Sequence, residues 1–425
     1  MDDILFLFIV VFALISLSVP VGFAIGGATI VTMLLFSDIP TFMIGQYAVS
    51  GIDSFSLMAI PFFILAGIVM SVGGLARRLV DVAASVVGYA TGGLGAVVGV
   101  ACMFFGAISG SAMATVSSIG SIMIPEMASK GYERGYAAAI TASAGTIGAI
   151  IPPSIPFVIF GVVTQTSIGD LFLAGVLPGI LMGVGIIIAN YVICKRKGIQ
   201  GSAERKTARQ NLRTIWDAKW ALLTPVVILG GIYSGIFSPT ESAVIGVVYA
   251  AVVSLFVYRE IGFKDLFRAI TDTASINGIT CFLLGLSTSF AAYLSMEQVP
   301  GKLMDFVLSL TDNKIIFLLI INVLLLVLGC IIDNIPAAII LSPILMPAML
   351  QFGVDPIHFG VFMTINLMIG LITPPYGCNL FVASAVAHVK MEKMLKYLLP
   401  FFIALIAILL IVTYIPAVSL VLLNK

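Results

Sequence analysis

Four short segments place proline, glycine and oxygen-bearing side chains in the middle of long apolar runs. They are Ser109–Ser111, Thr146 with Pro152–Ser154, Asp333–Pro336 and Thr373–Gly377. Proline lacks the N–H that would bond the preceding turn, so a carbonyl upstream of it loses its partner, while glycine lets other groups approach closely. Carbonyl and hydroxyl oxygens that converge from such breaks suit Na⁺. The amino-terminal ends of the half-helices carry positive dipole ends, which suit a carboxylate.

Asp333 is the one acidic residue that we expect deep in the membrane, where a charge costs roughly 2.5 to 3.5 kcal/mol on insertion scales. The preferred hypothesis is that Asp333 and Asn334 help to bind Na⁺ or tune its site. The alternative is a neutral or water-solvated acid that only caps the helix after it. Asn366 and Asn379 lie in apolar surroundings, and each could hydrogen-bond a substrate or tie helices together.

The composition predicts a membrane protein, because 60% of the 425 residues are hydrophobic and only 10% are charged. Apolar runs repeatedly reach the roughly 20 residues that one helical span needs. The net charge of +1 gives no basic field for nucleic acid. The five cysteines form no CxxC pair, no GxxxxGK[ST] loop occurs, and no nucleophile with an adjacent base can be assembled. We therefore expect neither an enzyme nor a cofactor.

The breaks and the apolar runs together predict two copies of one unit, separated by a basic loop. Residues 1–194 form the first copy, with scaffold helices over 1–72, an interfacial helix over 75–90, a re-entrant hairpin over 93–128, a broken span over 133–165 and a span over 170–194. Residues 195–219 form a cytoplasmic loop with eight basic residues. Residues 220–425 form the second copy, with scaffold helices over 220–295, an interfacial helix over 299–311, a hairpin over 314–350, a broken span over 355–388 and a span over 393–424.

Details within the scaffold helices follow from proline, glycine and charge. Pro20 divides the first apolar run, which is too long for one span, into two short helices. In the second copy we expect an interfacial piece around Lys264–Asp272, followed by a separate span to Leu294. The amino terminus lacks the basic region of a signal peptide, so we expect a retained first span.

The repeat is visible in the sequence itself. Sliding the chain along itself by 222 positions pairs Pro125 with Pro347, Gly131 with Gly353, Gly148 with Gly370, and Pro152–Pro153 with Pro374–Pro375. With both termini outside, all but Lys302, Lys314 and Lys425 of the 21 basic residues face the cytoplasm. The two copies then have opposite orientations. Inverted repeats with matching broken helices are typical of secondary transporters whose site lies near the bilayer midplane.

Motifs along essentially the whole chain resemble the large membrane subunit of the TRAP (tripartite ATP-independent periplasmic) transporters. They are VPVGFAIG, SGSAMATVSSIGSIMIPEM, TIGAIIPPSIPFVIFG, SPTESA, DNIPAAIILSPILMP and NLMIGLITPPYGCNLFVAS. The resemblance implies an all-α, multi-pass protein of the bacterial inner membrane and an elevator mechanism, in which a transport domain of hairpins and broken spans moves against a scaffold. It also implies sodium-driven uptake of an organic acid, among which we favour sialic acid over C4-dicarboxylates. The implied partners are a small four-helix membrane subunit and a periplasmic binding protein.

The resemblance also assigns residues to sites. The first sodium site would comprise Ser109, Gly110, Ser111, Ala112, Thr146 and Pro152, and the second Asp333, Asn334, Ile335, Gly370, Thr373 and Pro374. Substrate would contact Ser111, Pro153, Ser154, Asn334, Pro375, Tyr376, Gly377 and Asn379. The alternatives are a sodium/carboxylate symporter that needs no binding protein, an ion channel, and an intramembrane enzyme. A channel would conduct faster than a carrier, and an enzyme would need a nucleophile or a metal constellation.

Overall fold

The computed structural model describes residues 2–17, 19–199, 207–302, 311–375 and 377–423. Within these ranges the regular structure is helical, without strands. Six helices are long and apolar enough to cross a membrane, or up to seven if the bent pair 209–217 and 219–233 counts as one span. The all-α membrane fold predicted from the sequence is confirmed.

The first part of the chain folds into short helices separated by proline and glycine. They are α1 (Asp2–Ser16), α2 (Val21–Phe36), α3 (Phe42–Ile52), η1 (Phe55–Met58), α4 (Ala59–Val72) and α5 (Leu75–Val87). Pro20 precedes α2, where its missing N–H costs no helical hydrogen bond. Gly74, at a φ of +78°, allows the sharp turn from α4 into α5.

Two helix pairs and a long helix complete the first half. They are α6 (Gly93–Ser109), α7 (Ala112–Ser129), α8 (Arg134–Gly145) with η2 (Thr146–Ala149), α9 (Ile155–Thr164) and α10 (Ile168–Arg196). Residues 150–154 are non-helical and contain the Pro152–Pro153 peptide bond, which is cis. The chain is thus interrupted at 110–111 and again at 150–154.

The second half repeats this order. Its helices are α11 (Ala208–Asp217), α12 (Lys219–Tyr233), α13 (Pro239–Val252) with η3 (Val253–Val257), α14 (Phe263–Met296), α16 (Lys314–Gly329), α17 (Asn334–Gln351), α18 (Pro356–Gly370), α19 (Cys378–Ala387), α20 (Glu392–Tyr414), α21 (Ala417–Leu420) and η4 (Val421–Leu423). The Pro374–Pro375 bond, between α18 and α19, is also cis.

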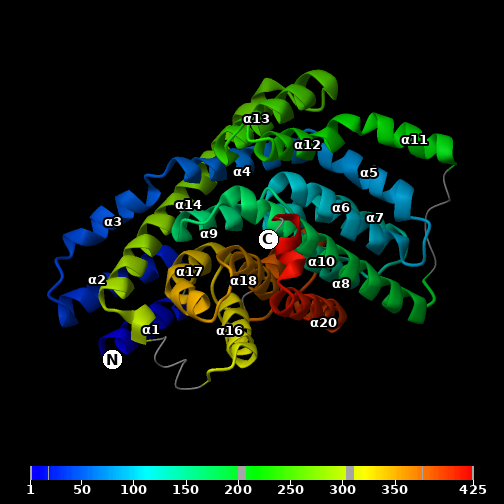
Figure 1. Cartoon of the computed structure of the whole chain (residues 1–425). Helices are drawn as coiled ribbons and strands as arrows, with labels where there is room; N and C mark the ends of the chain where they lie inside the picture. Colours follow the sequence, from blue (N-terminus) through cyan, green and yellow to red (C-terminus); the bar gives the residue numbers. More distant parts are fainter. Residues whose placement is uncertain (1, 18, 200–206, 303–310, 376, 424–425) are drawn as a thin grey trace.

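The helices form two groups. The outer helices, α1–α4 and α12–α14, pack mainly on one another, with α4 against α13 and with α2 and α3 against α14. The inner helices, α6–α10 and α16–α20, pack around the buried α8, α9 and α18, with α19 against α7 and α8. Figure 1 shows the outer helices along the upper and left edges, and the inner helices gathered below and to the right. The broken segments of both copies therefore lie inside one packed body.

The structure corrects the prediction for residues 195–219. These residues are not simply a loop, because α10 continues to Arg196 and α11 occupies the second half. At the start of α11 the N–H of Thr207 donates to the side-chain oxygen of Gln210 at 2.8 Å. Leu212, Ile215 and Trp216 recur at helical spacing among its polar residues. The many basic residues of 195–219 predict a solvated loop, but charges at this spacing also suit an amphipathic helix.

Two further predictions about helix limits need correction, and a third concerns residues that the structure mostly does not describe. The predicted interfacial piece at 264–272 and the span after it form one unbroken 34-residue helix, α14. The predicted final span over 393–424 ends at Tyr414, before Pro416, and short turns follow. The predicted interfacial helix at 299–311 lies mostly outside the described residues. Within the predicted scaffold region 1–72 the structure also contains α3 at Phe42–Ile52.

Candidate functional site

The first hairpin turns at a glycine that touches the broken helix. α6 ends at Ser109, Gly110 has a φ of +63°, and Ser111 caps α7. A Cβ on Gly110 would lie 2.8 Å from the carbonyl oxygen of Pro153. The backbone N–H of Ile155 donates to the carbonyl of Gly110 at 3.1 Å. The hairpin tip and the broken helix are thus joined through backbone atoms, as a shared ion site would require.

Buried hydroxyls gather behind this tip. The Thr115 hydroxyl donates to the carbonyl of Ser111 at 2.8 Å and lies 3.0 Å from the Ser109 hydroxyl. Gly148 faces them, since a Cβ there would lie 2.1 Å from Thr115 Oγ1. Thr146 is fully buried at the start of η2 and donates within its own helix. These oxygens retain lone pairs that a hard cation could use.

The other residues predicted for the first copy lie at the same two breaks. Ala112 is the first residue of α7 and is buried. Pro152 and Pro153 lie between η2 and α9, and Ser154 caps α9 by accepting a hydrogen bond from the N–H of Phe157 at 3.3 Å. α9 therefore begins at the tip of the first hairpin, with its positive end there.

The second hairpin tip carries the acid. Asp333 caps α17 and accepts a hydrogen bond from the N–H of Asn334 at 2.8 Å. Asn334 is buried, while Asp333 and Ile335 are half-buried. The capping contact is the one that the alternative interpretation of Asp333 required, but it uses only one carboxylate oxygen. The other oxygen is available to an ion or to water.

The second broken helix has the same design as the first. Gly370 ends α18, and a Cβ there would lie 2.4 Å from the carbonyl carbon of Gly329. In the first copy, a Cβ on Gly106 would lie 2.7 Å from the Cα of Gly148. In each copy, then, the hairpin and the broken helix touch through a pair of glycines. Side chains at these positions would force the breaks apart.

The remaining predicted residues of the second copy lie around this break. The Thr373 hydroxyl donates to the carbonyl of Ile369 at 2.8 Å. Pro374 and Pro375 follow, and Gly377, at a φ of +48°, precedes α19. Tyr376 lies outside the described residues. Among described residues no hydrogen bond joins 333–335 to 373–375, and the contact between the hairpin and this break is made by Gly329 and Gly370.

The two asparagines that the sequence left open differ in their contacts. Asn366 donates to the side-chain oxygen of Asn322 at 2.7 Å, which ties α18 to α16. Asn379 donates to the carbonyl of Ala142 at 3.2 Å, and this bond links α19 of the second copy to α8 of the first. Asn379 is completely buried, and its Oδ1 has no hydrogen-bond partner within the described structure. In both residues the side-chain NH₂ group serves to link two helices.

A cavity of about 600 Å³ brings the two hairpin tips together. Its inner wall includes Ser109 and Ser111 of the first tip and Asp333 and Ile335 of the second. Its outer wall comes from α4 and α14, namely Ile64, Gly67, Ile68, Ser71, Val72, Ile276, Ile279, Thr280 and Leu283. Met113, Ala114, Ser117, Ser118, Ile155 and Val382 complete the lining. The central cavity thus lies between the outer and inner helices.

The central cavity contains some of the predicted residues and adds others. Of the predicted substrate contacts, Ser111 lines it, whereas Pro153, Ser154, Asn334, Pro375, Gly377 and Asn379 do not. Sequence reasoning missed Thr115, Ser71 and Ser118. Ser71 and Ser118 lie 2.7 Å apart between their hydroxyls and connect α4 to α7. The sequence could have indicated Thr115, because it follows Ser111 by one helical turn. Nothing in the local sequence indicates Ser71.

Asp333 also borders a second cavity of about 940 Å³. Its other lining residues come from the α1–α2 turn, from α14 and from the second hairpin: Ile15, Val19, Pro20, Val21, Gly22, Phe23, Gly278, Ile279, Phe282, Leu283, Ile331 and Pro336. Asp333 is the one charged residue that lines either of these two cavities in the described structure.

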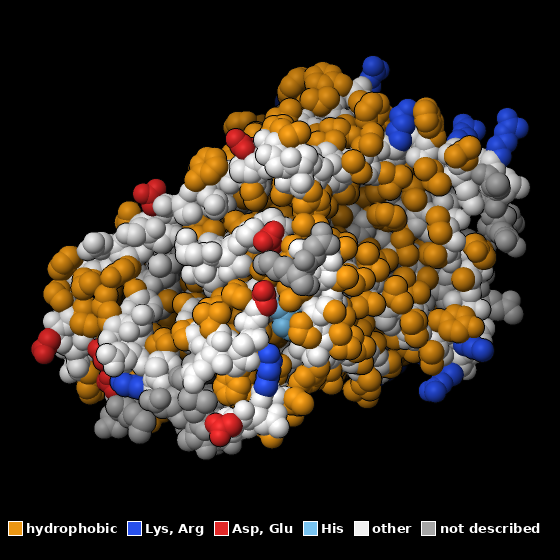
Figure 2. Space-filling view, viewed as in Figure 1, with side chains coloured by type: hydrophobic (Ala, Val, Ile, Leu, Met, Phe, Trp, Pro, Cys, Tyr) orange, Lys and Arg blue, Asp and Glu red, His pale blue; other side chains and the backbone are white. Residues whose placement is uncertain are grey.

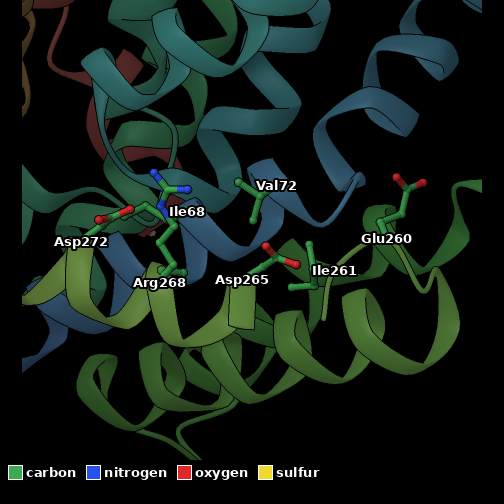
Figure 3. Close-up of a pocket in the computed structure, with 8 residues that line it drawn as sticks. Ile68, Val72, Glu260, Ile261, Asp265, Arg268 and Asp272 are labelled. Atoms are coloured by element: carbon green, nitrogen blue, oxygen red, sulfur yellow. The ribbon is translucent and has the colours of Figure 1, made fainter. Parts of the chain in front are cut away.

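A charged vestibule adjoins the central cavity. It has a volume of about 450 Å³ and shares Ile68 and Val72 with that cavity. Figure 3 shows Asp265, Arg268 and Asp272 rising from one face of α14 toward the helix that carries Ile68 and Val72. The same face continues to Ile276 and Leu283 in the central cavity. The outer wall thus offers a continuous path from a charged mouth to the hairpin tips.

The sequence matches a family model described as the DctM component of the tripartite ATP-independent periplasmic transporter over residues 8–418. It is 44% identical to the isethionate TRAP transporter permease protein DctMQ of Oleidesulfovibrio alaskensis over 94% of this chain, which spans 63% of that longer protein. It is 41% identical to the C4-dicarboxylate TRAP transporter large permease protein DctM of Pseudomonas aeruginosa, over 99% of this chain and 98% of that protein.

A third relative is the sialic acid TRAP transporter large permease protein SiaM of Vibrio cholerae, 36% identical over 96% of both chains. Among solved structures, the YdaH transporter of Alcanivorax borkumensis matches with a TM-score of 0.66, covering 89% of each chain at 15% identity. The structural match supports the fold alone, whereas the sequence matches extend over the whole chain.

Proposed function

This chain belongs to the DctM family of tripartite ATP-independent periplasmic transporters, and on that premise we propose that it drives sodium-coupled uptake of a small organic acid by an elevator mechanism. Members of this family are transporter permeases rather than enzymes. The observation that carries the proposal is the central cavity, in which the tips of both hairpins meet.

The charges in the central cavity favour coupling to cations. Its described lining contains no Lys or Arg, and its one charged residue is Asp333. An organic acid that enters this cavity brings a second negative charge into a low-dielectric region, where like charges repel strongly. One Na⁺ at each tip would neutralise both charges. Uptake of a monoanion with two Na⁺ would then move one net charge inward, for which the membrane potential supplies about 2.3 kcal/mol per 100 mV.

The oxygen-rich tips supply suitable ligands for those ions. In the first copy the carbonyls around Gly110 and the hydroxyls of Ser109 and Thr115 converge behind the tip. In the second copy Asp333 keeps one carboxylate oxygen beyond its capping bond. We assign the first ion to Ser109–Ala112 with Thr146, and the second to Asp333–Ile335 with Thr373. Helix amino termini at the same breaks attract the carboxylate of the substrate.

An elevator motion is supported by where the cavity lies. The outer helices would form the scaffold, and the inner helices would carry both tips as one packed body. Two of the contacts beside the cavity use small residues, since Gly67 of α4 faces Ser109 and Ser71 faces Ser118. Small side chains interdigitate little, so they offer little resistance to sliding of the inner helices along the outer ones. The charged vestibule would be the mouth through which cargo reaches the cytoplasm.

The substrate class rests on the relatives. Their names mention isethionate, C4-dicarboxylate and sialic acid, all of them small acids. Sialic acid stays our substrate prediction, and these matches do not single it out. The family name and the sequence resemblance support a small membrane subunit and a periplasmic binding protein as partners in the bacterial inner membrane.

Reconstitution tests the proposal directly. The chain is purified with a candidate small subunit and placed in liposomes with a candidate binding protein and radiolabelled sialic acid, isethionate or a C4-dicarboxylate outside. We expect uptake that needs an inward sodium gradient, rises with an inside-negative potential and stops without the binding protein. A potassium gradient of equal size is the control.

Uptake of equal rate without sodium would overturn the coupling proposal. Uptake that needs sodium but not the binding protein would instead identify a stand-alone symporter. Conduction of ions at channel rates without substrate would contradict a carrier mechanism altogether.

A further inference from the structure

A second polar pocket lies away from the central cavity, where the interfacial helix α5 meets α11 and the start of α12. It has a volume of about 560 Å³. Three basic residues, three acidic residues, three aromatic residues and one valine line it: Arg77, Arg78, Lys219, Asp81, Asp217, Glu260, Trp216, Trp220, Tyr258 and Val257. We refer to it as the α5–α11 pocket. The transport mechanism makes no use of it.

The basic residues of the α5–α11 pocket are held against aromatic rings. The Lys219 ammonium lies 3.8 Å from the centre of the Trp216 ring and 5.5 Å from that of Trp220. The Arg78 guanidinium lies 3.7 Å from the centre of the Tyr258 ring. Cation–π contacts of this kind fix a charge in place without neutralising it. The cations are therefore positioned for an anion.

The lining itself is balanced, with three acidic and three basic side chains, so the surplus positive charge comes from the cations around the pocket. Glu260 pairs with Arg78 at 2.9 Å, so the charges of these two side chains largely neutralise each other. Arg77 is exposed and has no hydrogen bond or ion pair with another described residue. Asp81 lies one helical turn after Arg77 on α5, and Asp217 lies two residues before Lys219. Further cations surround it, with Arg209 and Arg213 exposed on α11 and Arg259 exposed beside Glu260.

The geometry of α11 puts the α5–α11 pocket at the level of lipid headgroups. The axis of α11 bends by 56° from α12, which is apolar enough to enter the membrane together with it. Leu212, Ile215 and Trp216 expose 67%, 38% and 66% of their surface, and Arg209 and Arg213 lie on the same helix. A helix of this pattern lies in the interface with its apolar side chains among acyl chains. Trp and Tyr are typical of the same depth.

We propose that the α5–α11 pocket binds the phosphate headgroup of an anionic phospholipid of the cytoplasmic leaflet. Arg77 and Lys219 would donate to the phosphodiester oxygens, while the two indole rings lie beside the glycerol backbone. The exposed apolar side chains of α11 would follow the acyl chains. Phosphate is the favoured chemistry because Arg matches its oxygens and the cytoplasmic leaflet carries anionic lipids.

The two tryptophans make the test specific, because they are the only ones in the chain and both line this pocket. The full-length chain is placed in nanodiscs with either brominated phosphatidylglycerol or brominated phosphatidylcholine, and quenching of tryptophan fluorescence is measured against lipid fraction. We expect phosphatidylglycerol to quench at a several-fold lower fraction than phosphatidylcholine. Arg77→Gln and Lys219→Gln should each reduce that preference by about fivefold. The exposed Lys390, changed to Gln, is the matched control and should leave it unchanged.

Several results would overturn the proposal. They are equal quenching by the two lipids, an unchanged preference in both pocket variants, or an equal loss in Lys390→Gln, which would mean only general surface charge. Inorganic phosphate at matched ionic strength should not remove the preference; if it did, the pocket would be a site for free phosphate. None of these measurements depends on transport, so this inference can fail without the transport proposal failing.

Discussion

Asp333 shows why residue type alone leaves two interpretations open. The structure places its carboxylate both at a helix cap and at the border of two cavities. A capping oxygen and an ion ligand can belong to one carboxylate, because each of its oxygens has two lone pairs. The cap thus orients the side chain, and the oxygen that faces the cavity is the one that we assign to sodium.

Replacing Asp333 by Asn separates the two roles. Asn caps helices about as well as Asp, so the hairpin should keep its fold, but the negative charge is lost. We expect the sodium concentration for half-maximal uptake to rise by about tenfold, equivalent to ~1.4 kcal/mol. The measurement is initial uptake against sodium concentration in proteoliposomes.

Asp355→Asn is the matched control for this change, because Asp355 caps α18 through the N–H of Ile357 at 2.8 Å and lines none of the cavities described above. It should leave the sodium dependence as it is. If Asp333→Asn shows wild-type sodium dependence, Asp333 is only a cap and the second ion site lies elsewhere.

At the scale of elements, glycine pairs decide how closely each hairpin approaches its broken helix. Gly106 faces Gly148 in the first copy, and Gly329 faces Gly370 in the second. In both pairs a Cβ would fall within 3.4 Å of backbone atoms, which cannot move aside like a flexible side chain. The unwound segments are therefore held in place by backbone contact from a neighbouring helix.

Gly370→Ala should disturb this contact. The new methyl group would lie 2.4 Å from the carbonyl carbon of Gly329, so α16 and α18 must separate. We expect a loss of about 1–3 kcal/mol in stability, typical of overpacking. Thermal unfolding of the purified protein should show a Tm lower by several degrees.

Gly27→Ala is the control for this experiment, since a Cβ on Gly27 of α2 would meet nothing within 4 Å. Alanine is also the better helix former there, so the Tm should stay the same or rise. Equal Tm values for Gly370→Ala and the unchanged protein would contradict the close contact between the helices.

For the whole molecule, charge separates along one direction. Figure 2 shows most Lys and Arg side chains along the upper and right edges, with Asp and Glu mainly to the left and below. Figure 1 places α11 and the far ends of α5 and α10 on the basic side. This separation is the one expected if the basic edge faces the cytoplasm. The orientation, in which the second copy is inverted relative to the first, stays a prediction.

Cysteine labelling tests that inversion with a pair of equivalent positions. Ser129 and Gln351 are 222 positions apart, and both are exposed at the end of the second hairpin helix. In a chain whose five native cysteines are replaced, Ser129→Cys should react with an impermeant maleimide only after the membrane is opened. Gln351→Cys should react in intact cells. Labelling of both from the same side would show that the copies are parallel.

The sequence was sufficient for the helix breaks. Proline and glycine act on their own backbone, so Gly110 and the paired prolines 152–153 and 374–375 indicate interruptions locally, whereas single prolines such as Pro125 and Pro347 lie inside helices. The apolar run lengths gave the membrane class for the same reason. The same local reasoning went wrong at 264–272, where charges suggested an interfacial piece. The helix continues there because no proline lies between Phe263 and Met296, and Asp265, Arg268 and Asp272 line the vestibule.

Only the tertiary structure decided which oxygens and which walls meet. Ser71 reaches Ser118, and Asn379 of the second copy reaches Ala142 of the first, across separations of 47 and 237 residues. Likewise the central cavity joins tips that lie more than 200 positions apart in the chain. A local pattern specifies where the backbone unwinds, whereas the partner of each unwound segment depends on how the two copies pack.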